Sequence, residues 1–181
     1  MHRLFVAVDL PDDVRSSLAG VCRPIPGAKW VPPEQLHLTL RFIGDADDST
    51  FAAIRNALAG VHGVSFPLAV RGVGHFPPGK HPRVMWVGLE PCEPLLALQQ
   101  EIETAVVAAG IPPDPRRFSP HITIARLKEA QLAKVDEFEA ACRTLAYEPF
   151  PVAEFHLYSS TLSNKGAIHR RERTYLLQPH A

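Results

Sequence analysis

A pattern of histidine, aliphatic residue, threonine and aliphatic residue occurs twice in this chain of 181 residues. The copies are His37-Leu38-Thr39-Leu40 and His121-Ile122-Thr123-Ile124, and their histidines are 84 positions apart. Such alternation predicts a β-strand, in which successive side chains point to opposite faces. Each copy then presents an imidazole and a hydroxyl on one face, while its two aliphatic side chains face a core.

The duplication argues for a function. A single strand histidine is usually a half-buried residue of the fold and needs no chemical role. From the frequencies of the residue types, chance predicts roughly 0.07 copies of the pattern in this chain. Two copies, each with its threonine at the same offset, therefore favour a shared site.

Length and composition limit the class of protein. A chain of 181 residues, 46% of them hydrophobic, can form one compact domain or two small lobes that share an interface. The apolar segment 4–8 is interrupted by Asp9 and Pro11, so it is too short for a secretory signal or a membrane-spanning helix. The three cysteines match no metal-binding or disulfide pattern. We expect a cytoplasmic monomer that does not contact a membrane.

The formal net charge is zero, with 19 basic and 19 acidic residues. This balance excludes a protein that binds nucleic acid through an overall positive field. An acidic ligand would have to be bound by a local site.

Hydrophobic periodicity and turn residues divide the chain into strands and helices. Loops are expected at 24–33, with a short extended piece at 30–31, and at 74–82. Helices are expected at about 11–22, 47–60 and 129–145, and from 95 to a stop at Gly110 and Pro112. The expected strands are 3–10, 36–43, 66–73, 83–89, 118–127, 155–162 and 173–178.

The order strand, helix, motif strand occurs twice along the chain. This repetition predicts an α+β fold in which two pseudo-symmetric lobes of mainly antiparallel sheet carry their helices outside. The two motif strands would face a cleft between the lobes, and residues 1–181 would form a single bilobal domain.

Two imidazoles in one cleft suit acid–base chemistry near neutral pH, because each can donate or accept a proton there. A neutral imidazole could activate water while a protonated one supplies a proton to a leaving oxygen. The adjacent threonine hydroxyls and the nearby Arg126 could donate hydrogen bonds to a phosphate. Phosphoester hydrolysis without a metal or another cofactor fits this set best.

Other catalytic constellations are poorly represented. Neither motif has a carboxylate or a second metal ligand within four residues, as a zinc site would require. The chain has no GxSxG, P-loop or GxGxxG motif. Asp9 could either orient a motif histidine or cap the following helix.

The motifs and their flanking segments resemble one known family. It is the two-histidine phosphoesterase superfamily, and within it the RNA 2′,3′-cyclic phosphodiesterases, once described as 2′-5′ RNA ligases. The resemblance covers nearly the whole chain and is more specific than the two motifs alone. The segments that carry it are 3–8 (RLFVAV), 10–11 (LP), 30–44 (WVPPEQLHLTLRFIG), 72–77 (GVGHFP), 82–88 (PRVMWVG), 118–126 (FSPHITIAR) and 157–160 (LYSS).

The resemblance implies a bilobal fold in which His37 and His121 are catalytic, Thr39 and Thr123 hold the phosphate and Arg126 assists. The implied substrates are RNA ends or nucleotides with a 2′,3′-cyclic phosphate, and the implied product is a 2′-phosphate. By the same analogy His121 is the base for water and His37 the acid for the leaving 3′ oxygen. In reverse, the pair would join RNA ends through a 2′-5′ bond.

Two segments leave alternatives open. Where the family leads us to expect a tyrosine soon after Gly166, this chain has His169 followed by Arg170 and Arg171. That run could be a phosphate-binding rim or a solvated turn. Phe76 could stack on a terminal base, as aromatic residues do in single-stranded RNA complexes, or pack under its proline-rich loop.

Two other functions are compatible with the sequence. The first is a non-catalytic module that binds RNA ends or nucleotides in the same cleft, although such a module needs no pair of titrating groups. The second is an enzyme of the same superfamily that acts on another substrate, such as a cyclic ADP-ribose phosphate or a 2′-5′ linked oligonucleotide.

Overall fold

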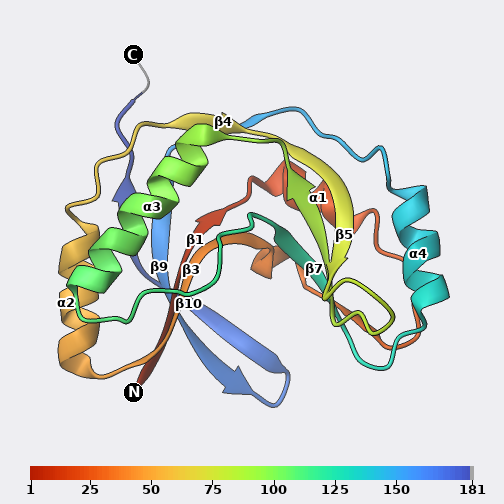
Figure 1. Ribbon diagram of the computed structural model, residues 1–181, viewed down its shortest axis with the longest axis horizontal. Helices are drawn as coiled ribbons and strands as arrows, with labels where there is room; N and C mark the ends of the chain where they lie inside the picture. The colour runs from red at the N-terminus through yellow and green to blue at the C-terminus, as the bar shows by residue number, and fades with distance from the viewer. Residues whose placement is uncertain (180–181) are drawn as a thin grey trace.

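Two four-stranded antiparallel sheets form the framework of the protein (Figure 1). A computed structural model describes residues 1–179 of the chain. The first sheet has the order β10-β9-β1-β3 and contains β1 (His2–Asp9), β3 (His37–Ala46), β9 (Glu154–Ser163) and β10 (Gly166–Leu176). The second sheet has the order β2-β7-β6-β5 and contains β2 (Ala28–Trp30), β5 (Val70–Phe76), β6 (Val84–Leu89) and β7 (Ile122–Leu127). A further pair joins β4 (Phe66–Leu68) to β8 (Phe150–Val152).

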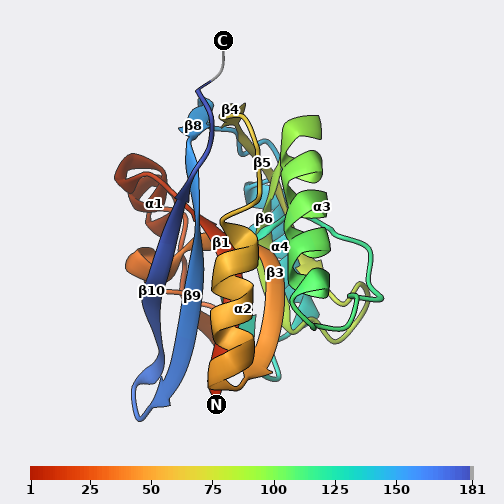
Figure 2. The same ribbon diagram turned by 90° about the vertical axis from the view of Figure 1, so that its left-hand side faces the viewer.

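Four α-helices cover the sheets. The helices are α1 (Asp12–Ala19), α2 (Asp48–Leu58), α3 (Glu93–Ala108) and α4 (Leu132–Ala141), and a 3-10 turn, η1 (Pro33–Gln35), precedes β3. Helices α2 and α3 pack against each other and against β3, whereas α4 lies at the opposite end of the molecule (Figures 1 and 2).

Local sequence explains where α2 begins and which face it buries. The side chain of Asp47 accepts a hydrogen bond of 2.8 Å from the backbone N–H of Thr50, as an N-cap residue should. Phe51, Ile54 and Leu58 then recur at helical spacing and are buried. The remaining polar positions of α2 can face solvent.

The expected repetition of strand, helix and motif strand is present. In the first lobe β1 and α1 are followed, after β2 and η1, by β3, which pairs antiparallel with β1. In the second lobe β6, α3 and β7 follow one another, and β7 pairs antiparallel with β6. Strands β3 and β7 approach each other, so the two motif strands meet where the lobes meet. The predicted α+β class with two lobes of antiparallel sheet is confirmed.

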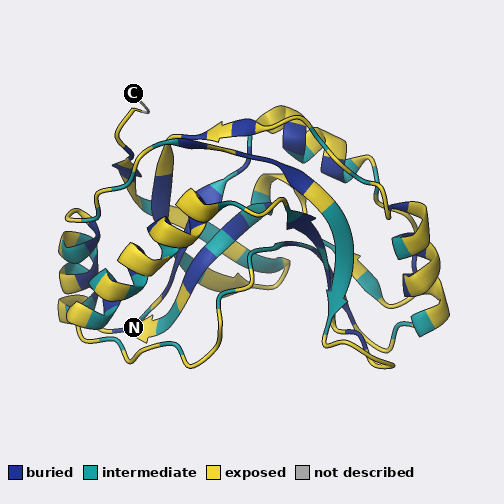
Figure 3. Cartoon of the chain, turned by 45° about the horizontal axis from the view of Figure 1, so that its top comes forward, coloured by how far each residue is buried: buried dark blue, intermediate teal, exposed yellow. Residues whose placement is uncertain are grey.

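The core is continuous across both sheets. Residues Leu4 to Val8 of β1 are all buried, and β1 pairs with β3 on one side and β9 on the other. Buried apolar side chains of β1, β3, β6, β7 and β9 form one cluster with those of all four helices. Figure 3 shows this buried layer beneath the exposed outer faces of the helices. The expectation that residues 1–181 form one domain stays a prediction.

Several element boundaries differ from those expected, and β8 was not expected. Strand β10 begins at Gly166, where a φ of 115° closes the hairpin, rather than at 173. Its exposed half has no apolar alternation, because the β9–β10 hairpin projects from the body of the protein (Figures 1 and 2). Strand β5 continues to Phe76, into the expected loop. Strand β7 begins at Ile122 rather than 118, after Pro120, which lacks a backbone donor for the sheet.

Within residues 1–179, no helix combines the length and the apolar character required to cross a membrane.

The central packing of β9 predicts a stability difference between two positions of this strand. Phe155 is completely buried and stacks on Tyr175 at 4.9 Å between ring centroids, whereas Leu162 is 84% exposed. Urea denaturation should show that Phe155→Ala lowers the free energy of unfolding by about 3–5 kcal/mol. Leu162→Ala should change it by less than about 0.5 kcal/mol. Similar small losses in both variants would contradict the assigned core.

Candidate active site

His37 is held at the start of β3 by three contacts. Its Nδ1 donates a hydrogen bond of 2.6 Å to the carbonyl oxygen of Gln35, two residues earlier. Its ring stacks on Phe5 of the neighbouring strand β1, with 5.1 Å between centroids. The side chain of Gln35 also donates to the carbonyl oxygen of Ala167 at 2.8 Å, which ties the turn before β3 to β10. The position of this histidine therefore depends on three segments that are distant in sequence.

His121 has the same local arrangement directly before β7. Its Nδ1 donates a hydrogen bond of 2.7 Å to the carbonyl oxygen of Ser119, again two residues earlier. Its ring meets the edge of Phe76 at 5.0 Å between centroids. Phe76 in turn packs on Trp86, which lies across Gly74, where a Cβ atom would be only 2.3 Å from the indole. Each motif histidine is thus fixed by a carbonyl oxygen and an aromatic ring.

This repeated hydrogen bond selects the tautomer of both histidines. With Nδ1 protonated and bonded to a carbonyl oxygen, Nε2 becomes the nitrogen that can accept or donate a transferred proton. Within residues 1–179, the Nε2 atoms of His37 and His121 have no hydrogen-bond partner. The two lobes therefore present chemically equivalent atoms.

A groove of about 940 Å³ joins the two motifs. Thr39 from the first lobe lines it together with His121, Thr123, Arg126 and Phe76 from the second. In the described part of the chain, neither threonine hydroxyl forms a hydrogen bond, and the Arg126 guanidinium forms no hydrogen bond or ion pair. The groove thus holds two hydroxyl donors and a planar cation that are available to a ligand.

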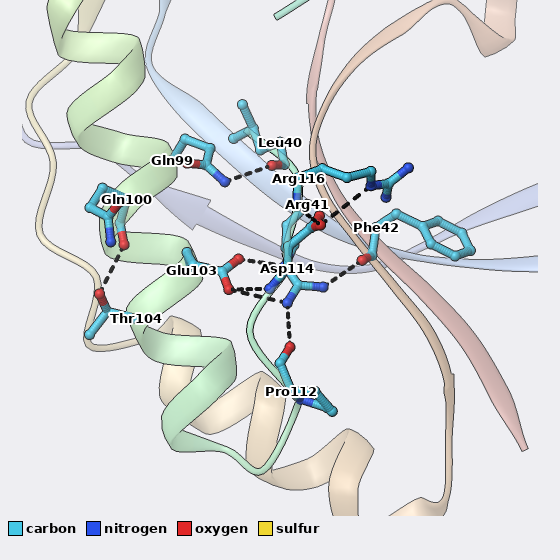
Figure 4. Close-up of polar contacts among 10 residues, drawn as sticks. All are labelled: Leu40, Arg41, Phe42, Gln99, Gln100, Glu103, Thr104, Pro112, Asp114 and Arg116. Atoms are coloured by element: carbon cyan, nitrogen blue, oxygen red, sulfur yellow. Dashed lines mark hydrogen bonds and ion pairs between the residues drawn. The ribbon is translucent and has the colours of Figure 1, made fainter. Parts of the chain in front are cut away.

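A bulge in β3 decides which of its side chains are buried. Pairing with β1 skips Leu40, since Ala7 pairs with Thr39 and Val6 pairs with Arg41. Leu40 and Arg41 are consequently both buried, and Phe42 is exposed. Figure 4 shows Arg41 pointing towards α3, where it donates to Glu103 at 2.5 and 3.2 Å.

Burial affects the ionisation of His37. The pKa of His37 is lowered to about 4, mainly because the ring is removed from water, and the nearby His169 and Arg15 also oppose protonation. The carbonyl oxygen of Gln35 and the carboxylate of Asp9 act in the opposite direction and compensate only in part. In the protein without ligand, His37 is neutral at pH 7.

His169 lies in the site, although sequence reasoning placed it only in a possible rim. Its ring is 5.5 Å from that of His37 and 5.0 Å from that of Phe5, between centroids. Burial and the charge of Arg126 lower its pKa. A third imidazole therefore adjoins the first motif histidine, on a strand that is more than 100 residues away in sequence.

The two arginines that follow His169 pair with carboxylates, and one of these carboxylates is that of Asp9. Arg171 pairs with Asp9, which also accepts a hydrogen bond of 2.5 Å from Tyr158. Burial opposes ionisation of Asp9, but the Tyr158 hydrogen bond and the charges of His156 and Arg171 outweigh it and lower its pKa. Asp9 forms no hydrogen bond with His37 among the described residues and does not cap α1, whose N-cap is Pro11. Arg170 is exposed, 3.9 Å from Glu172.

The groove brings together Thr39, Phe76, His121, Thr123 and Arg126, whereas His37 is not among the residues that line it. Phe76 packs on Trp86 and lines the groove beside His121, and its stacking on a terminal base stays a prediction. Sequence reasoning missed Phe5 and Trp86 as ring contacts, since each reads as an ordinary apolar strand residue. Within residues 1–179, no group of three histidine, cysteine or acidic side chains could hold a metal ion.

Comparison with known proteins identifies the family. A sequence model of the 2′-5′ RNA ligase superfamily matches residues 10–164. The chain belongs to this superfamily. The RNA 2′,3′-cyclic phosphodiesterase of Thermotoga maritima is 33% identical over 176 residues, covering 93% of this chain and 91% of that protein. The RNA 2′,3′-cyclic phosphodiesterase of Thermus thermophilus is 36% identical over 179 residues, covering 92% and 86%. The family expected from the motifs is confirmed.

Solved structures share the fold. The crystal structure of TT0787 of Thermus thermophilus is 32% identical and superposes with a TM-score of 0.79, covering 99% of this chain and 100% of that one. The crystal structure of E. coli LigT complexed with 3′-AMP is 25% identical with a TM-score of 0.77, covering 97% and 98%. The superfamily members therefore agree with this chain over almost their entire length.

The environment of His37 predicts its titration. NMR of the histidine ring protons should give a midpoint near pH 4 for a resonance that His37→Gln removes. Because the folded protein binds this proton more weakly than the unfolded chain does, stability should fall as the pH falls from the ordinary value of 6.5 towards 4. His37→Gln should lose less stability over this window. A midpoint near 6.5 would contradict the described burial.

Proposed function

We propose that this protein is a metal-independent RNA 2′,3′-cyclic phosphodiesterase that uses His37 and His121 as an acid–base pair. The observation that carries the proposal is the matched orientation of the two histidines, each bonded through Nδ1 to a carbonyl oxygen two residues earlier. Relatives that match over most of the chain bear the name of this activity. RNA ends and nucleotides with a 2′,3′-cyclic phosphate are the proposed substrates.

In the proposed reaction, the two histidines act on opposite sides of the phosphorus. His121 Nε2 accepts a proton from water as the water oxygen attacks phosphorus in line with the 3′ oxygen. The bond between phosphorus and the 3′ oxygen breaks, and His37 Nε2 donates its proton to that oxygen. The products are a 3′ hydroxyl and a 2′-phosphate. With the 5′ hydroxyl of a second RNA in place of water, the same proton transfers and the same P–O3′ cleavage would join two RNA ends through a 2′-5′ bond.

The low pKa of His37 is compatible with the acid role. A group of low pKa releases its proton readily to a leaving oxygen, and the anionic cyclic phosphate favours the protonated imidazole when it binds. The carbonyl oxygen of Gln35 also favours the protonated ring. Substrate binding and proton loading of His37 are then linked.

The remaining groups of the groove bind the substrate in this proposal. Thr39 and Thr123 donate to the non-bridging oxygens, and Arg126 stabilises the charge that develops on them. Phe76 offers a ring to the terminal base beside His121. His169 is a positioning residue that packs on His37. We further expect a cytoplasmic monomer that requires no cofactor.

A binding module without turnover would have no use for two oriented proton-transfer atoms. The matched Nδ1 hydrogen bonds therefore favour the enzyme over the module. An enzyme acting on another cyclic or 2′-5′ linked nucleotide would use the same two histidines, and substrate comparison distinguishes it.

Removal of either histidine should remove most of the activity. With 2′,3′-cyclic AMP as the substrate and EDTA in the buffer, His37→Ala and His121→Ala should each lower kcat by about 10²-fold or more, the usual worth of one general acid or base. In the double variant, the fold-decrease in kcat should be smaller than the product of the decreases in the two single variants. The control is His62→Ala, because His62 is exposed and lies outside the groove.

Two results would overturn the proposal. Near wild-type turnover in either single variant would exclude the acid–base pair. Loss of wild-type activity in EDTA, restored by added zinc or manganese, would indicate a metallohydrolase instead.

A further inference from the structure

The groove extends well beyond the residues needed for a cyclic phosphate. Its lining also includes Arg116 and Arg117 of the segment between α3 and β7, and Gln99, Gln100 and Leu96 of α3. None of these five residues has a part in the proposed bond cleavage. The space they line is continuous with the site of His121 and Thr123.

A buried ion pair fixes the segment that carries the two arginines. Arg41 donates to Glu103 on α3 and, at 2.7 Å, to the carbonyl oxygen of Pro112. Glu103 also accepts a hydrogen bond of 3.1 Å from the backbone N–H of Asp114. The side chain of Asp114 then accepts from the backbone N–H of Arg116 at 3.0 Å. Figure 4 shows these bonds as one chain from β3 through α3 to the segment 112–116.

The composition of the segment adds to this order. Residues 111–120 read IPPDPRRFSP, and each of the four prolines fixes its own φ. The same segment contains Ser119, whose carbonyl oxygen orients His121. The arginines and the proton-transfer histidine are therefore placed by one stiff element, which reduces the entropy lost when a ligand binds.

The charge of the groove contrasts with that of the whole chain. The protein has a formal net charge of zero, but four arginines and two carboxylates line the groove. Both carboxylates are engaged, Glu103 with Arg41 and Asp114 with Arg116. Arg117 has no hydrogen-bond or ion-pair partner among residues 1–179 and is exposed. The unneutralised positive charge therefore lies at Arg117 and Arg126, at two separate positions in the groove.

Apolar and amide groups lie between these charges. Leu96 is 47% exposed and Phe42 is 42% exposed, and both line the groove together with Phe118. Gln99 donates through Nε2 to the carbonyl oxygen of Leu40 at 3.3 Å, which leaves its own Oε1 as an acceptor. Cations for phosphates, apolar faces for bases and amide acceptors for base edges are the features of a surface for single-stranded nucleic acid.

We propose that the part of the groove formed by Arg116, Arg117 and the adjoining face of α3 binds the nucleotide on the 5′ side of the terminal one. Arg116 and Arg117 contact the internucleotide phosphate, whereas Arg126 binds the cyclic phosphate. This inference rests on the proposed function. It makes an RNA chain, rather than a free cyclic mononucleotide, the better substrate.

The test compares substrates that differ only on the 5′ side. Values of kcat/KM are measured for 2′,3′-cyclic AMP and for a triadenylate with the same cyclic end. The wild type should prefer the trinucleotide by about tenfold or more, the worth of one hydrogen bond to a charged group. Arg116→Ala/Arg117→Ala should lose most of this preference. Arg117→Ala alone should lose part of it without disturbing the segment, because Arg117 has no described partner.

A matched control removes the same charge elsewhere. Arg23→Ala/Arg143→Ala removes two exposed arginines beside the end of α4, outside the groove, and should keep the preference for the trinucleotide. Equal kcat/KM values for the two substrates in the wild type would overturn the inference. A full preference retained in Arg116→Ala/Arg117→Ala would also overturn it.

A binding measurement separates this inference from the proposed function. A fluorescently labelled triadenylate ending in a 2′-phosphate should bind the Arg116→Ala/Arg117→Ala variant about tenfold more weakly than the wild type, with a smaller salt dependence. If that result were obtained and neither cyclic substrate were hydrolysed, the binding site for the 5′-side nucleotide would be supported and the proposed reaction would be rejected. Equal affinity and equal salt dependence in both proteins would show that Arg116 and Arg117 do not bind the 5′-side nucleotide.

Discussion

The hydrogen bond from each motif histidine to the carbonyl oxygen two residues earlier organises the site. It fixes the tautomer of His37 and His121 and leaves the same nitrogen, Nε2, without a hydrogen-bond partner among residues 1–179. The bond depends on a turn directly before each motif strand, η1 in one lobe and the proline-rich segment 111–120 in the other. Aromatic rings, Phe5 and Phe76, then hold each imidazole in place. The two pseudo-symmetric lobes therefore orient the Nε2 atoms of His37 and His121 in the same way.

The two lobes nevertheless give these histidines different surroundings. His37 packs among Phe5 and His169 and has its pKa lowered by burial, whereas His121 stands at the edge of an open groove beside Arg126. Equivalent geometry with unequal environments is what an acid–base pair requires, because its two members must hold protons at different stages of one reaction. The Arg41–Glu103 ion pair contributes to the surroundings of His121, because Arg41 also holds the segment that precedes this histidine.

Much of this architecture could be predicted from local sequence. The two alternating motifs predicted strands with the histidine and threonine on one face, and Asp47 marked the start of α2. Two features could not be predicted in this way. Alternation places Arg41 on the face of His37 and Thr39, but the bulge at Leu40 buries it. His169 reaches His37 through the order β10-β9-β1-β3, and such long-range pairing leaves no local signal in a charged segment.

The identity of the product tests the central claim most directly. If His121 and His37 act from opposite sides on a ribose bound in one sense, hydrolysis of a 2′,3′-cyclic nucleotide must break a single bond. Phosphorus NMR of the completed reaction, against both standards, should show the 2′-phosphate almost exclusively. A mixture of the two isomers would contradict a single bound orientation, and a product that is mainly the 3′-phosphate would reverse the roles assigned to the two histidines.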